Sequence, residues 1–267
     1  MNTGKRIHLL CSTICLGIFL VTSNLSGADS FKEIETKAET GDAEAQFHLG
    51  QMYSNGQGVT KNEAEALKHW IRAAEKGFTA AQILLGLMYE NGRGVIKDEA
   101  EAMKWYRKAA EQGDANAQYS LGVMYANGDG VIRNEAEAIK WWSKAAEQGI
   151  ARAQCNLGVM YANGRGVVKN EEEAVKWYRQ AAEQGIVRAQ LNLGYMYALG
   201  RGVIKDTTTA YIWYLIAGAK GDEQARKNIP IIEREMTPSQ RAKGQRIAND
   251  WKPSKFSGQV QSSRNLP

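Results

Sequence analysis

The pattern of apolar and polar positions along this chain repeats every 36 residues. The motif Leu-Gly-x-x-Tyr begins at Leu49, Leu85, Leu121, Leu157 and Leu193. Glycines at the same interval close the units: Gly41, Gly77, Gly113, Gly149, Gly185 and Gly221. A fixed period of this length predicts stacked units that bury their apolar faces only against their neighbours. Such an array favours a binding surface over a catalytic pocket.

Each unit reads as two helices. Apolar residues spaced three and four apart, such as Ala45, Leu49 and Met52, predict a first helix over 43–55, which Gly56 ends. A second helix is expected to run from Asn62, its N-cap, to residue 76. Glu65 follows the cap by three residues and predicts a capping box, as do Glu101, Glu137 and Glu173 in later units.

Small and aromatic positions predict how the helices pack. Gly50 and its copies lie inside the first helix, where glycine costs about 1 kcal/mol relative to alanine. Close approach of the second helix is the simplest reason for that cost. Two aromatic columns on the second helix, on the face of the repeated alanines, are expected in the core. They are Trp70, Tyr106, Trp142, Tyr178 and Tyr214, and His69, Trp105, Trp141, Trp177 and Trp213. A ladder for sugars or bases is the alternative.

These motifs carry a resemblance to a known family. Leu-Gly-x-x-Tyr followed by Ala66-x-x-x-Trp70 resembles the tetratricopeptide pattern. The 36-residue period and the Gly-x-Gly-Val loop resemble the Sel-like repeat, over 41–76, 77–112, 113–148, 149–184 and 185–220. The resemblance implies an all-α, right-handed α/α superhelical solenoid that acts as an adaptor or scaffold for other proteins. Bacterial members are often exported.

The N-terminal residues 1–28 read as a signal peptide. Lys5 and Arg6 precede an apolar stretch over 7–21, which is shorter than the ~20 residues of a membrane span. Small residues over 26–28 predict cleavage before Asp29. We therefore expect an exported protein, periplasmic or secreted, with no stable membrane insertion after cleavage. An uncleaved membrane anchor is the alternative.

Segments outside the repeats read as caps for the array. Residues 29–40 predict a capping helix, with Ser30 and Glu33 in capping-box spacing. Residues 221–251 predict C-terminal capping helices, the last opened by Thr237 with Pro238 in its first turn. The polar residues 252–267 are expected to be disordered.

The distribution of charge and the cysteine content narrow the classes of function that fit the chain. The net charge of +5 is concentrated at the C-terminus, where residues 221–267 carry nine basic and five acidic side chains. The repeats are close to neutral and have no basic stripe, which argues against nucleic acid as a partner. Beyond the leader, Cys155 is the only cysteine and lies in an apolar column, so a buried thiol is expected.

The sequence motifs predict neither an enzyme nor a cofactor. His48 and His69 are the histidines beyond the leader, and no spacing typical of zinc ligands is present. Neither Ser-x-x-Lys nor Gly-x-Ser-x-Gly occurs, although a β-lactamase-like activity has been described for the family. The Gly-x-Gly segments lack the context of a nucleotide-binding loop and are read as turns.

Function is therefore sought where the first helix varies between units. One such stripe of positions on the first helix carries apolar side chains in the second unit. In the fourth and fifth units the same stripe carries arginine and asparagine side chains. The candidate partner-binding residues are Leu84, Leu87, Arg152, Asn156, Arg188, Asn192 and Tyr195. Fixed cations beside amide donors suit an extended peptide or its carboxyl terminus. We expect a non-enzymatic adaptor that binds a protein or peptide on its concave surface. The alternatives are solvated helix residues without a function, a peptidoglycan- or glycan-binding protein and a β-lactamase-like protein.

Overall fold

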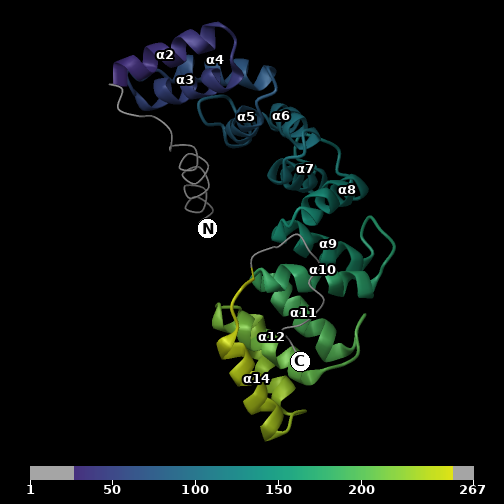
Figure 1. Ribbon diagram of the computed structural model, residues 1–267. Helices are drawn as coiled ribbons and strands as arrows, with labels where there is room; N and C mark the ends of the chain where they lie inside the picture. Colours follow the sequence, from purple (N-terminus) through teal and green to yellow (C-terminus); the bar gives the residue numbers. More distant parts are fainter. Residues whose placement is uncertain (1–26, 255–267) are drawn as a thin grey trace. The chain divides into compact units, whose positions relative to one another are not determined.

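The computed structural model describes residues 27–254, which form thirteen helices and no strand, an all-α solenoid (Figure 1). The first helices of the five repeats are α3 (Ala43–Asn55), α5 (Thr79–Asn91), α7 (Ala115–Asn127), α9 (Ala151–Asn163) and α11 (Val187–Leu199). The second helices are α4 (Glu63–Glu75), α6 (Glu99–Glu111), α8 (Glu135–Glu147), α10 (Glu171–Glu183) and α12 (Thr207–Ala219). The flanking helices are α2 (Gly27–Glu39), α13 (Glu223–Glu233) and α14 (Pro238–Asp250). None of these helices is long and apolar enough to cross a membrane.

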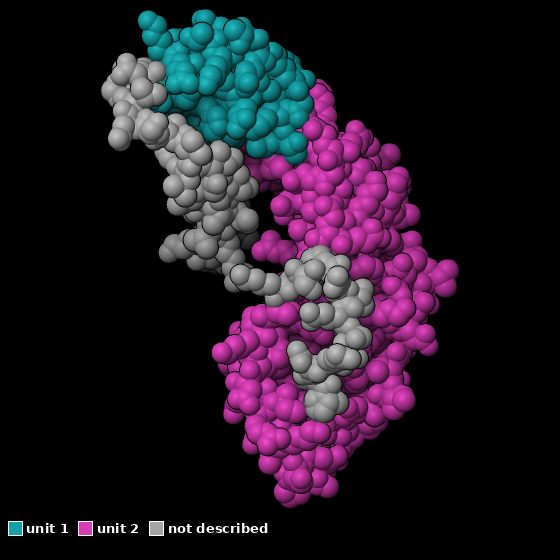
Figure 2. Space-filling model, in the orientation of Figure 1, with its two compact units in different colours: residues 1–81 teal, residues 82–267 magenta. Residues whose placement is uncertain are grey.

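The chain divides into two compact units, residues 1–81 and 82–267 (Figure 2). In the first unit, α3 packs against both α2 and α4. In the second, each helix from α6 to α13 packs against the next, and α14 packs on α12. Each helix therefore buries its apolar face against near neighbours in sequence, as the repeat predicts.

The helix ends follow the predicted chemistry, with one exception. Gly128 ends α7 with φ +88°, and Asn134 caps α8 by accepting from the backbone N–H groups of Ala136 and Glu137. The predicted capping boxes of the second helices are wrong. The backbone N–H of Asn134 donates to the carbonyl of Tyr125 at 2.8 Å, so Glu137 pairs with a lysine one turn on instead. The same bond to the repeat tyrosine recurs in every unit, from Asn62, Asp98, Asn170 and Asp206.

The glycine inside each first helix allows the close approach that the sequence predicted. A Cβ built on Gly158 would lie 2.5 Å from the Tyr178 ring, well inside van der Waals contact. Tyr106, Trp142 and Tyr214 occupy the same position against Gly86, Gly122 and Gly194. The aromatic ring of the second helix therefore packs directly on the backbone of the first.

The second glycine of the Gly-x-Gly loop has a separate role that the sequence alone did not indicate. Gly130, with φ +68°, lies on the backbone at the start of α6, where a Cβ would be 2.5 Å from the carbonyl carbon of Glu99. Gly166 and Gly202 meet Glu135 and Glu171 in the same way. These glycines hold the loop of one repeat against the second helix of the repeat before it.

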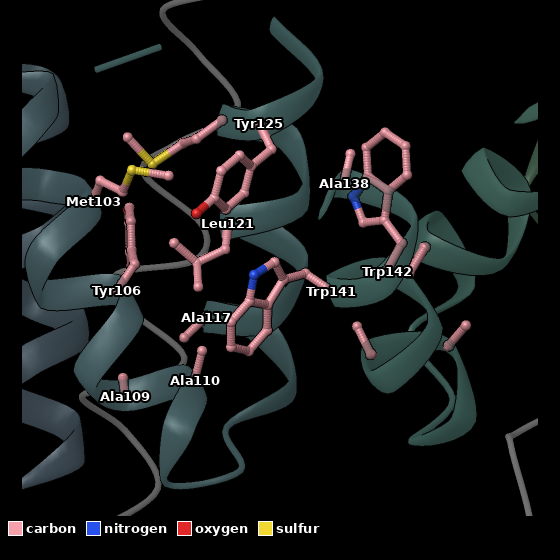
Figure 3. Close-up of a cluster of buried hydrophobic side chains, with 14 of the residues drawn as sticks. Met103, Tyr106, Ala109, Ala110, Ala117, Leu121, Tyr125, Ala138, Trp141 and Trp142 are labelled. Carbon is pink, nitrogen blue, oxygen red and sulfur yellow. The ribbon is translucent and has the colours of Figure 1, made fainter. Parts of the chain in front are cut away.

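The core consists of the predicted columns. Figure 3 shows Tyr106 of α6, Leu121 of α7 and Trp141 of α8 contributing to one cluster of buried side chains. Trp213 is fully buried, whereas Trp177 of α10 is partly buried. The aromatic ladder is therefore core, as expected. In the first unit, His69 is buried and its ring stacks on Tyr53.

A buried glutamine on each first helix was not predicted. Gln154 donates from Nε2 to the carbonyl of Ala146, near the end of α8, at 3.1 Å. Its Oε1 accepts from Gln184, the C-cap of α10, at 2.8 Å. Gln118 makes the same pair of bonds with Ala110 and Gln148. These side chains satisfy carbonyls that a helix end leaves without an intrahelical partner.

One exposed position is apolar in four repeats. It follows a partly buried valine in the loop between the two helices, and its members are 86–90% exposed: Ile96, Ile132, Val168 and Ile204. Thr60 stands there in the first repeat. The side chains lie at equivalent places in successive repeats, so they form a regular row.

The ends of the array differ from the sequence expectations in two places. Helix α2 begins at Gly27, so Ser30 lies inside the helix and is not its cap. Thr237 and Gln240 do form the capping box of α14. Trp251 packs edge-on against Trp213, and the backbone N–H of Ser254 donates to the carbonyl of Glu183 at 2.9 Å. Residues 252–254 thus lie on α10. Most of the predicted signal peptide, residues 1–26, and the end of the tail, residues 255–267, fall outside the described residues.

Candidate functional site

Five of the predicted site residues lie on two neighbouring first helices. Arg152 and Asn156 are one turn apart on α9, and Arg188, Asn192 and Tyr195 occupy two turns of α11. The two arginines are exposed and the other three side chains are partly buried. Because α9 and α11 contact each other directly, the stripe is continuous across the fourth and fifth repeats.

Two adjoining hollows open beside this stripe. The larger, of about 350 Å³, is lined by Tyr119, Val123, Ala126, Asn127, Trp142, Asn156, Val159, Met160, Arg165 and Arg188. The smaller, of about 240 Å³, is lined by Val159, Ala162, Asn163, Tyr178, Arg188, Asn192, Tyr195 and Met196. Val159 and Arg188 belong to both linings, so the hollows meet at these two residues. The floor and walls come mainly from α7, α9 and α11.

Two tyrosines lie beside the amides of the stripe. Asn156 is next to the Tyr119 phenol, and Asn192 is next to the Tyr178 phenol. Burial raises the pKa of both phenols, and the nearby amides act in the opposite direction. Each hollow therefore has one amide beside a buried phenol at its edge.

The two arginines of the stripe are free of carboxylate partners. None of the ion pairs within residues 27–254 includes Arg152 or Arg188, whose neighbours are instead Tyr119, Tyr178 and Cys155. The loop cations nearby differ, because Arg133 and Arg165 both bind Glu135 and hold the pKa of its carboxyl below its usual range. Arg152 and Arg188 can therefore bind an external anion without breaking an existing pair.

The remaining candidates lie apart from the hollows. Leu84 and Leu87 are partly buried on α5, and Leu87 packs against the cluster around α7. Neither lines either hollow. Conversely, the hollows include Tyr119, Asn127 and Arg165, which the sequence analysis did not select. Asn127 and Asn163 stand at a position that is Asn in the first four repeats, so a search for variable positions passes over them.

Cys155 lies beneath the site, as a buried thiol. It is 3% exposed, and burial raises its pKa to about 11. A thiol protonated at neutral pH is a poor nucleophile, so the geometry supports packing as its role. Within residues 27–254, no three His, Cys, Asp or Glu side chains are grouped closely enough to hold a metal ion.

Paired helices of constant length that recur every 36 residues define a helical-repeat solenoid. The Sel1 repeat family model matches five times, over residues 43–78, 79–114, 115–150, 151–186 and 187–222. The chain belongs to the Sel1 repeat family. These matches begin two residues after the repeat boundaries read from the sequence.

Solved structures that are similar to the chain include two bacterial proteins. One is the c5321 protein, a protective antigen of uropathogenic Escherichia coli with an SLR fold, at 40% identity and a TM-score of 0.69. The similarity covers 80% of this chain and 48% of that protein, so this chain spans about half of its length. The other is a Sel1 repeat protein from Oxalobacter formigenes, at 36% identity and a TM-score of 0.69, covering 84% and 94% of the two chains. No curated protein matches the chain.

Proposed function

We propose that this protein is an exported, non-enzymatic adaptor that binds a protein or peptide through the groove on its first helices, the surface expected to be concave. Sel1 repeat proteins are generally protein-interaction scaffolds, and the family is generally non-catalytic. The observation that carries the proposal is the pair of unpaired cations, Arg152 and Arg188, beside two adjoining hollows. A peptide carboxylate is the partner chemistry that suits them.

Export rests on the sequence of residues 1–28, which has the basic, apolar and small-residue segments of a signal peptide. The relatives with known structures are bacterial, which agrees with a periplasmic or secreted location. Fusing the leader to a reporter enzyme that is active only outside the cytoplasm tests this part. A fusion that stays inactive would contradict export.

The glycan-binding alternative loses its main support in the structure. It depended on the aromatic columns, whose members are buried apart from the partly buried Trp177. Trp142 and Tyr178 line the hollows, and the other buried rings present no face to a sugar. The β-lactamase alternative has no feature in the groove that favours it over binding, and turnover of a chromogenic β-lactam remains its direct test.

Charge reversal in the groove tests the proposal. The double variant Arg152→Glu, Arg188→Glu should lose partner capture in crosslinking from the native cell, because the anion site becomes repulsive. Its circular dichroism should be unchanged, since neither arginine is buried or in an ion pair. Unchanged capture of the same partners would refute the groove assignment.

A matched control separates this site from the net charge. Lys227→Glu with Lys243→Glu makes the same change in charge on α13 and α14, at exposed positions outside both hollows. Capture by this control should equal that of the unmodified protein. Equal losses in the two variants would mean that the whole protein's charge, rather than the groove, recruits the partner.

A further inference from the structure

The two hollows are copies of one site, one repeat apart. Seven of the eight residues lining the smaller hollow stand 36 positions after a residue lining the larger one. The pairs are Val123 with Val159, Ala126 with Ala162, Asn127 with Asn163, Trp142 with Tyr178, Asn156 with Asn192, Val159 with Tyr195, and Met160 with Met196. A ligand that fills both hollows therefore meets the same chemistry twice, at the spacing of adjacent first helices.

That spacing selects a backbone conformation. Packed helices lie about 8–10 Å apart. In a polyproline II chain, side chains three residues apart share a face and are separated by about 9.3 Å. In a β-strand the corresponding distances are about 6.8 Å for two residues and about 13.5 Å for four. The polyproline II repeat lies within the range for packed helices such as α9 and α11, and neither strand spacing does.

The hollows differ in size, and at one position the smaller hollow carries the larger side chain. Tyr195 stands in the smaller hollow where Val159 stands in the larger. Its ring is held edge-on against Tyr214, with centroids 5.8 Å apart. The second hollow therefore suits a smaller side chain than the first.

The charge between the hollows adds a third requirement. Arg188 lines both of them and has no carboxylate partner within the described residues. Asn156 and Asn192, one repeat apart, place an amide group in the lining of each hollow. A ligand carboxylate between the two apolar side chains would pair with Arg188, and the amides can bond the peptide backbone on either side.

From these observations we infer that the groove binds a polyproline II segment whose residues i and i+3 fill the two hollows. The larger apolar side chain enters the hollow at Val123, the smaller enters the hollow at Tyr195, and an acidic residue between them meets Arg188. This inference rests on the proposed groove function and specifies its ligand.

The test uses capped synthetic peptides and calorimetry with the purified protein. The reference peptide is Pro-Pro-Leu-Glu-Pro-Val-Pro-Pro, made also with Leu and Val exchanged to cover both chain directions. Further peptides place the two apolar residues two or four positions apart, or replace Glu by Gln.

The peptide with three-residue spacing should bind at least ten-fold more tightly than the peptides with the other spacings. The Gln peptide should lose about ten-fold, and Arg188→Ala should abolish that difference.

A second variant tests the size rule by a gain of binding. Tyr195→Val gives the second hollow the valine that the first has at this position, so a peptide with Leu at both positions should bind the variant more tightly than the unmodified protein. Equal affinities for all spacings, or no binding of any peptide, would overturn the polyproline II assignment. If partner capture still depended on Arg152 and Arg188 in that case, the proposed groove function would stand without the polyproline II assignment. If the peptides did not bind and capture did not depend on the arginines, both proposals would be refuted.

Discussion

At the scale of single residues, two glycines from the two loops that flank α7 can be separated by experiment. Gly113 and Gly130 both have positive φ, of +97° and +68°, but only Gly130 faces a neighbouring backbone. Gly113→Ala should cost about 1 kcal/mol of unfolding free energy, from the left-handed conformation alone. Gly130→Ala should cost at least about 1 kcal/mol more, because the start of α6 must move.

Urea unfolding of the two variants measures this difference. Equal losses of stability would show that the loop does not depend on close contact with the preceding repeat. The comparison is matched, since both substitutions add one methyl group at a glycine that already has positive φ.

The thiol of Cys155 predicts a pH dependence of stability. Burial raises its pKa from 9.0 to about 11, so above pH 9 the unfolded chain loses a proton that the folded chain retains. Stability should therefore fall as the pH rises from 9 to 11, by roughly 2 kcal/mol for this group, and be unaffected by it below pH 9.

Cys155→Ala provides the comparison, because it removes the thiol and leaves the buried tyrosines, whose pKa values burial also raises. The difference in unfolding free energy between the two proteins should shrink or reverse as the pH rises from 9 to 11. A constant difference would mean that the folded and unfolded thiols titrate together.

At the scale of helices, the caps offer a graded test. Asn134 accepts from two backbone N–H groups at the start of α8. Asn134→Ala should lower the unfolding free energy by about 1 kcal/mol, whereas Asn134→Asp should be nearly neutral. Asp98 and Asp206 make the same bonds in their own repeats, which supports the second expectation. Thermal unfolding followed by circular dichroism distinguishes the two, and a similar loss for both would argue against side-chain capping.

The helices could be predicted from the sequence because each signal was local. Ala45, Leu49 and Met52 set the period of α3, and Gly56 ended it within a turn. The capping boxes failed for a non-local reason, since the backbone of Asn62 bonds to Tyr53 on the preceding helix.

Long-range bonds also explain what the sequence did not show. Gln154 bonds groups 8 and 30 residues away, and no local pattern marks it as a capping residue for other helices. The candidate site was predicted in part for a related reason. Variation between repeats indicated Arg188 and Asn192. Asn163 lines the same hollow, but its position is Asn in the first four repeats, so only the structure reveals it.

At the scale of the whole molecule, the same order of packed helices recurs from repeat to repeat within the second unit, which implies that the number of repeats can change. Deleting residues 115–150 joins Asp114 directly to Ala151. Asp114, which caps α7 in the intact protein, then takes the place of Ile150 at the start of α9. This variant should keep its helical content per residue and unfold cooperatively at a lower urea concentration, because stability in such arrays sums over neighbours.

Deleting only residues 115–132 is the control. It removes a first helix and places two second helices in succession, so the joints no longer match. This protein should lose cooperative unfolding and much of its helicity. Equal behaviour of the two deletions would show that the 36-residue unit is not the unit of stability.

The exposed row of Ile96, Ile132, Val168 and Ile204 has a consequence for handling the protein. Four apolar tips at regular spacing give the surface an affinity for alkyl-coated matrices and for air–water boundaries, independent of any biological partner. Thr60 shows that a hydroxyl-bearing side chain fits this place in the repeat. Changing all four residues to threonine should make the protein elute earlier from a phenyl column at high salt, with its circular dichroism unchanged. The altered protein would also foam and adsorb less, which suits it to dilute work on glass and plastic.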